Sequence, residues 1–167
     1  MSLTTPNPEV YNYYELQGLG LKNMNSLTTK EEKQENLNYE INTFRATCKV
    51  FFSGIRYGRF WHNILIEAFA LHTRVLIDFF YCDQKLKGDD IIAQDLLPDD
   101  KVWKDLRPPI PDILKEAKEK VNKQLAHLSE GRILLEKQGK KDWKILEIFN
   151  EMNKIIDLFI ETQKIKF

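Results

Sequence analysis

Glycine and proline are confined to a few short segments of this chain, and this distribution constrains the fold more than any other feature. The 167-residue sequence has only seven glycines and six prolines. Both residues interrupt helices, glycine through its backbone freedom and proline through its ring and missing N–H. The stretches between them carry apolar residues at helical spacing and show no β-branched alternation or hairpin-turn dipeptides. The sequence therefore predicts an all-α protein.

The predicted architecture is an up-and-down bundle of four long helices with a partly helical connector. The helices are expected at residues 29–53, 59–85, 112–129 and 142–167, with the connector and its two short helical turns at 88–111. The short link at 54–58 makes the first two helices antiparallel neighbours. Residues 1–28 are expected to form an N-terminal segment with a short helix at 7–17. Residues 29–167 then form a single helical-bundle domain.

Local patterns define where the first helix begins and which residues form the core. Thr28 or Thr29, with Glu31 or Glu32 three positions later, resembles a capping box. Aspartates at 89–90 and 99–100 are expected to start the two turns of the connector. The expected core and anchor residues are Leu37, Ile41, Phe44, Cys48, Phe51 and Ile55; Phe69, Val75, Leu76 and Phe79; Ile91, Ile92, Leu96, Leu97, Val102, Trp103 and Leu106; Leu114, Ala117, Val121, Leu125 and Leu128; Ile145, Phe149, Met152, Ile156 and Phe159.

Composition and charge argue against several classes of protein. The net charge of zero argues against a large nucleic-acid surface. Residues 60–81 are long enough to span a bilayer, but Glu67, Arg74 and Asp78 would each cost about 2.5–3.5 kcal/mol there. With no signal peptide, we predict a cytoplasmic protein with no membrane partner. Cys48 and Cys82 are expected to be free buried thiols.

The second helix carries a polar seam within the most apolar part of the sequence. Glu67, Arg74 and Asp78 fall on one narrow face, whereas His72 lies on the apolar side. The favoured interpretation is a network of ion pairs or a solvated face, with Arg74 paired to Glu67 or Asp78. If Arg74 is enclosed, its loss should cost several kcal/mol. The alternative is a polar pocket between helices, in which Glu67, His72, Arg74 and Asp78 bind a ligand. For His72, a satisfied core histidine is the favoured reading.

A second candidate site lies near the end of the third helix. Asn122, His127 and Arg132 form it, and Lys120 is an additional binding residue. His127 faces away from the apolar stripe of its helix, so it is either an ordinary surface histidine or faces a second subunit. A histidine with an ordinary pKa exchanges protons near neutral pH, and the surrounding residues 115–144 are locally basic. This is where a phosphate group would bind.

Other chemistries find no support in the sequence. The three histidines lack the H-E-x-x-H and E-x-x-H patterns of zinc and di-iron sites. There is no glycine-rich phosphate loop and no G-x-S-x-G nucleophile elbow. We therefore expect no metal site and no cofactor.

Three features of the sequence point to a known family: the helical layout, the segment Leu71-His72-Thr73-Arg74, and the stretch from Asn122 through His127 to Arg132. They resemble uncharacterised bacterial proteins related to the HEPN superfamily. That family's hallmark is an Arg followed four to six residues later by a His. Here Asn122 and His127 match the polar residue and the His, but Lys120, Val121 and Asn122 stand where the Arg would be. The resemblance implies either a phosphate-directed ribonuclease, often acting as a dimer, or a nucleotide-binding partner protein.

Two functions remain open at this stage. The favoured one is a HEPN-like module that binds a protein partner or nucleotide without catalysis, because the Arg is missing and the net charge is neutral. The alternative is a metal-independent ribonuclease that uses His127 as acid and base, with Lys120 or Arg132 as the cation. A homodimer and RNA are further candidate partners.

Overall fold

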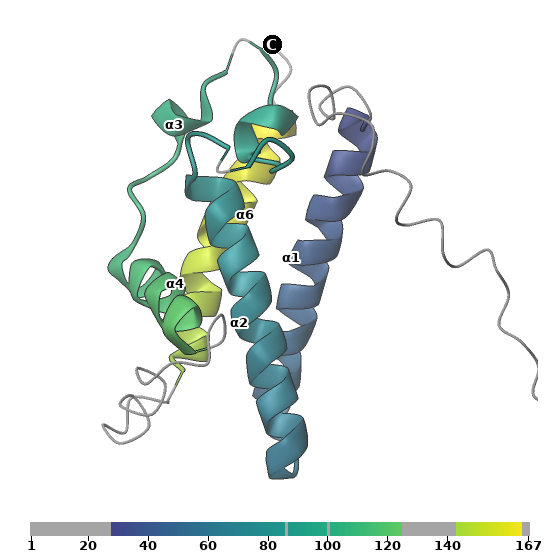
Figure 1. Ribbon diagram of the computed structural model, residues 1–167, viewed down its shortest axis with the longest axis vertical. Coiled ribbons are helices and arrows are strands. Elements are labelled where there is room, and N and C mark those ends of the chain that lie inside the picture. Colours follow the sequence, from purple (N-terminus) through teal and green to yellow (C-terminus); the bar gives the residue numbers. More distant parts are fainter. Residues whose placement is uncertain (1–27, 86, 100, 125–142, 165–167) are drawn as a thin grey trace, which may run out of the picture.

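The computed structural model describes residues 28–85, 87–99, 101–124 and 143–164, and every described regular element is a helix. Figure 1 shows their arrangement. The elements are α1 (Lys30–Phe52), α2 (Arg59–Tyr81), the 3-10 helix η4 (Ala93–Leu96), α3 (Trp103–Leu106), α4 (Asp112–Gln124) and α6 (Ile145–Lys164). The prediction of an all-α fold is confirmed. The predicted short helix at 7–17 and the predicted end of the third helix at Ser129 lie outside the described residues.

The long helices pack side by side in an up-and-down order. α1 and α2 form an antiparallel hairpin. Contacts between helices fix the direction of α6 against α1: the amide of Gln163 donates to Gln34 at 2.8 Å, and Nε of Arg45 donates to Asn153 at 2.7 Å. α4 packs on α2 and α6. The helix order thus follows the sequence-based prediction.

The capping box predicted for the first helix is present, with Thr29 as the cap. Its hydroxyl accepts a hydrogen bond from the Glu32 backbone N–H at 3.1 Å, and its own N–H donates to the Glu32 carboxylate at 2.7 Å. These two bonds satisfy two donors that a helix start leaves unpaired. The far end of α1 is terminated by Gly54, whose φ of +71° is the left-handed conformation that glycine adopts without strain.

The core lies between α1, α2, α4 and α6 and is rich in phenylalanine. Phe44, Phe69, Phe80 and Phe159 are completely buried. Phe69, Leu76 and Phe79 are buried as predicted, but Val75 is not: its exposed fraction is 37%. The reason is that Val75 borders an open cavity between α1 and the chain that follows α2. Ile55 is exposed because α1 has already ended at Phe52.

The connector has its two predicted helical turns, η4 and α3, but they begin later than expected. The residues before them are Ile92 and Val102 rather than the aspartates at 89–90 and 99–100. Trp103 anchors the connector, because its buried indole N–H donates to the Phe80 carbonyl at 2.7 Å. The expected anchors Val102 and Leu106 are instead exposed, with exposed fractions of 52% and 45%.

Two further sequence-based expectations concern the membrane and the thiols. In the part of the chain that the structure describes, no helix has the length and apolar character needed to cross a bilayer. Both cysteines are free; Cys48 is buried as predicted, whereas Cys82 is partly exposed because α2 ends at Tyr81, before the predicted Lys85.

Candidate functional site

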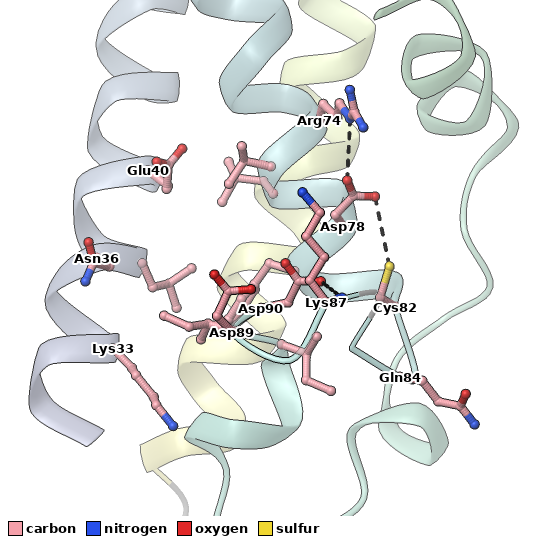
Figure 2. Close-up of a pocket in the computed structure, with 16 residues that line it drawn as sticks. Lys33, Asn36, Glu40, Arg74, Asp78, Cys82, Gln84, Lys87, Asp89 and Asp90 are labelled. Carbon is pink, nitrogen blue, oxygen red and sulfur yellow. Dashed lines mark hydrogen bonds and ion pairs between the residues drawn. The ribbon is translucent and has the colours of Figure 1, made fainter. Parts of the chain in front are cut away.

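A cavity of about 530 Å³ lies between α1, α2 and the segment 82–92, and Figure 2 shows the residues that line it. This volume is within the range of pockets that bind small molecules and cofactors. The N-terminal half of α1 forms one wall and the C-terminal half of α2 the other. The chain after α2 forms the third wall, and Lys104 and Arg107 hold it there through ion pairs with Asp83.

The floor of the cavity is apolar and belongs to the core of the bundle. Leu37 comes from α1, Leu76 and Phe79 come from α2, and Ile92 comes from the following segment; all four are buried. They are positioned by the same helical stripes that build the core, so the floor is rigid. Such a surface suits an apolar or planar part of a ligand.

Charged side chains from all three walls surround this floor. Lys33 and Glu40 project from α1 and Asp78 from α2, while Lys87 and Asp89 stand on the following segment. In the view of Figure 2, the Lys33 and Lys87 side chains stand at opposite ends of the lining and point in opposite directions. The lining therefore combines both signs of charge around an apolar centre.

Most of the carboxylates in the cavity are already occupied. Asp78 pairs with Lys118 of α4 at 2.6 Å and with Nε of Arg74 at 3.6 Å. Glu40 contacts Nδ1 of His72 at 2.7 Å. The carboxylate of Asp90 accepts a hydrogen bond from the Lys87 backbone N–H at 2.6 Å.

The side chains of two lysines that line the cavity have no hydrogen-bond or ion-pair partner among the described residues. Neither the Lys33 ammonium nor the Lys87 ammonium has a hydrogen bond or ion pair with any described residue. Lys33 is partly buried, and Lys87 is exposed. A ligand anion can therefore contact either ammonium group without displacing a partner among the described residues.

Cys82 also lines the cavity, but its thiol is not activated. Burial raises the pKa of Cys82, and the carboxylate of Asp78 raises it further, while Lys118 opposes the shift. The thiolate is the reactive form of cysteine. At neutral pH, Cys82 therefore stays a thiol, which donates weakly to Asp78 at 4.0 Å.

The structure brings only part of the predicted polar-seam site together. Arg74 and Asp78 line the cavity, and His72 lies behind it as the partner of Glu40. His72 is buried and hydrogen-bonded, which confirms the reading of a satisfied core histidine. Arg74 pairs with Asp78, one of its two predicted partners. Glu67 is exposed and does not line the cavity.

The second predicted site is described only in part. Lys120 lies over the Trp143 ring, with its ammonium 4.6 Å from the ring centre, and Asn122 is half-buried on α4. Neither lines the cavity. His127 and Arg132 lie outside the described residues. Among the described residues, no group of three or more His, Cys, Asp or Glu side chains is arranged to hold a metal ion.

The sequence did not single out several residues of the cavity. Lys33, Leu37 and Glu40 share one face of α1 because they follow one another at spacings of four and three, so helix periodicity could have grouped them. The 87–92 segment has no comparable signal. Its place at the cavity depends on α3, which is anchored by Trp103 through a contact distant in sequence.

Comparisons with known proteins add no relative: no family model, curated protein or solved structure matches this chain.

Proposed function

We propose that this protein is a HEPN-like helical module that binds a nucleotide in the cavity between α1 and α2 and does not transform it. The observation that carries the proposal is the pair of uncommitted ammonium groups, Lys33 and Lys87, beside a buried apolar floor. A nucleotide joins a planar base to a phosphate, so it presents one group suited to each part of the cavity. The resemblance of the sequence to HEPN-related proteins supports the same ligand class.

The remaining polar groups of the cavity suit the rest of a nucleotide. Asn36, Gln84 and Asp89 are exposed and can hydrogen-bond the edge of a base or the hydroxyls of a ribose. The volume of about 530 Å³ leaves room for one mononucleotide rather than a longer chain. The proposed ligand is therefore a nucleoside monophosphate.

The absence of catalysis is proposed because the half-buried carboxylates of this cavity are engaged. A general base must be able to reach the proton that it removes. Glu40 is held by His72, and Asp78 is held by Lys118 and Arg74. These contacts stabilise the bundle and leave binding as the activity that the cavity supports.

Isothermal titration calorimetry with adenosine monophosphate tests the proposal. Lys33→Gln and Lys87→Gln should each weaken binding about fivefold to tenfold, because each removes one positive charge from the lining that attracts the anionic ligand. Adenosine, which lacks the phosphate, should bind the wild type as weakly as the double variant binds the monophosphate. Lys115→Gln is the matched control, since this lysine is exposed on α4, does not line the cavity and pairs with the exposed Asp112. Absence of heat with the wild type, or equal affinity for all variants, would refute the proposal.

One observation supports the alternative, a metal-independent ribonuclease that uses His127. The Asp78–Lys118 ion pair sets the register between α2 and the antiparallel α4. Arg74 precedes Asp78 by one helical turn, and Asn122 follows Lys118 by one turn, so the two stand at the same level of the packed helices. Arg74 is therefore a third candidate, besides Lys120 and Arg132, for the cation that the motif lacks.

A further inference from the structure

The end of the α1–α2 hairpin carries a group of exposed apolar side chains, which we call the hairpin tip. It consists of Phe52, Ile55, Tyr57, Phe60, Trp61 and Ile64, whose exposed fractions range from 38% to 69%. Figure 1 shows this end of the hairpin projecting beyond α4 and α6 along the long axis of the molecule. A contiguous group of large apolar side chains in water is unfavourable, and such groups mark surfaces that bind something.

The hairpin tip is also positively charged. The sequence has no aspartate or glutamate between Glu40 and Glu67. Lys49, Arg56 and Arg59 are exposed there, and none has an ion pair with any described residue. In a chain of zero net charge, this end therefore concentrates uncompensated positive charge beside exposed rings.

We propose that the hairpin tip docks on the surface of an anionic lipid bilayer. Phe60 and Trp61 enter the interfacial layer, where aromatic side chains are favoured, and Arg56 and Arg59 contact the negative headgroups. The sequence led us to expect no membrane partner because residues 60–81 carry too much charge to span a bilayer. Surface docking needs no spanning helix, so the proposal revises that expectation for the membrane surface alone.

Other occupants fit the hairpin tip less well. In a symmetric contact with a second copy, the cations of both tips would face each other, which is repulsive. A single-stranded nucleic acid stacks its bases on open ring faces. Phe60 and Trp61 instead meet edge to face, with ring centroids 5.5 Å apart and ring planes at 73° to each other. Ile55 and Ile64 offer no ring, whereas a bilayer accepts apolar groups of any shape.

Co-sedimentation of the full chain with lipid vesicles tests this inference. The protein should bind vesicles that contain phosphatidylglycerol, bind phosphatidylcholine vesicles far less, and be released by salt. The double variant Arg56→Gln/Arg59→Gln should reduce partitioning about tenfold or more. Phe60→Ser/Trp61→Ser should reduce it by a similar factor. Both variants alter exposed residues, so folding should be retained, as far-UV circular dichroism can verify.

Matched controls lie away from the hairpin tip, on α6 and in the connector. Lys154→Gln removes an exposed cation of α6, and Val102→Ser removes a connector side chain that is 52% exposed. Both should partition like the wild type. The inference is overturned if wild-type protein does not bind phosphatidylglycerol vesicles, or if tip and control variants bind equally. It is also overturned if the tip variants leave vesicle binding intact and abolish dimer formation or retention of single-stranded RNA.

Discussion

Several charged residues of this protein form contacts between helices and so do not present free reactive groups. Asp78 is the clearest case, because its carboxylate on α2 contacts Lys118 on α4 and Arg74 one turn away. The Asp78 side chain is only 29% exposed. A carboxylate shared by two cations at the edge of a cavity stabilises the packing of α2 on α4. It also holds the wall of the proposed ligand site in place.

Removing Asp78 should therefore cost more stability than removing Arg74. We expect Asp78→Ala to lower the free energy of unfolding by about 1–2 kcal/mol and Arg74→Ala by less than about 1 kcal/mol. The larger cost expected for an enclosed Arg74 does not apply, because its side chain is 39% exposed and its contact is 3.6 Å long. Urea denaturation measures both variants. A loss of about 3 kcal/mol or more for Arg74→Ala would show that the arginine is enclosed after all.

The two thiols should differ in reactivity. Burial raises the pKa of Cys48 to about 12, whereas Cys82 is partly exposed, and burial and the Asp78 carboxylate raise its pKa above the ordinary value. An aromatic disulfide reagent at pH 8 should label Cys82 in the native protein and Cys48 only after unfolding. Because the unfolded thiol ionises near 9.0 while native Cys48 stays protonated, stability should fall as pH rises from 9 to 12. Rapid native labelling of Cys48 would contradict its burial.

At the scale of the helices, the stability of the α1–α2 hairpin depends on the turn at residues 53–58. Gly54 has a φ of +71°, and a Cβ built there would meet no atom within 4 Å, so any cost of Gly54→Ala is conformational. We expect a loss of about 1 kcal/mol in thermal or urea unfolding. Gly88→Ala is the matched control, because its φ is outside the left-handed region and its surroundings are equally open. It should be neutral or slightly stabilising. Equal losses at both positions would exclude a special role for the left-handed turn.

Periodic local signals predicted the long elements well, and contacts distant in sequence account for what was missed. The cap at Thr29 and the stripe from Leu37 to Cys48 depend only on neighbouring residues in one helix. Val75 was misplaced because its exposure depends on the chain after α2, which leaves a cavity there. The Glu40–His72 pair joins two helices, and one sequence cannot tell which surface polar residue reaches a buried histidine.

At the scale of the whole molecule, the bundle has the cavity at one end of the α1–α2 hairpin and the basic apolar tip at the other. Binding and ribonuclease activity make opposite predictions for RNA. Incubated with single-stranded RNA and no metal, the wild type and His127→Ala should both leave the RNA intact. Gel electrophoresis of the products measures this. Cleavage that disappears in His127→Ala would establish the ribonuclease alternative in place of the binding module.

The most direct test of the central claim is hydrogen–deuterium exchange of the full chain with and without saturating adenosine monophosphate. A ligand in the cavity should slow amide exchange at residues 33–40 and 87–92, which face each other across it. Exchange at residues 145–150 of α6, which do not line the cavity, should stay unchanged. Exchange that is unaffected by the nucleotide, or protection confined to residues 112–124 of α4, would contradict the account.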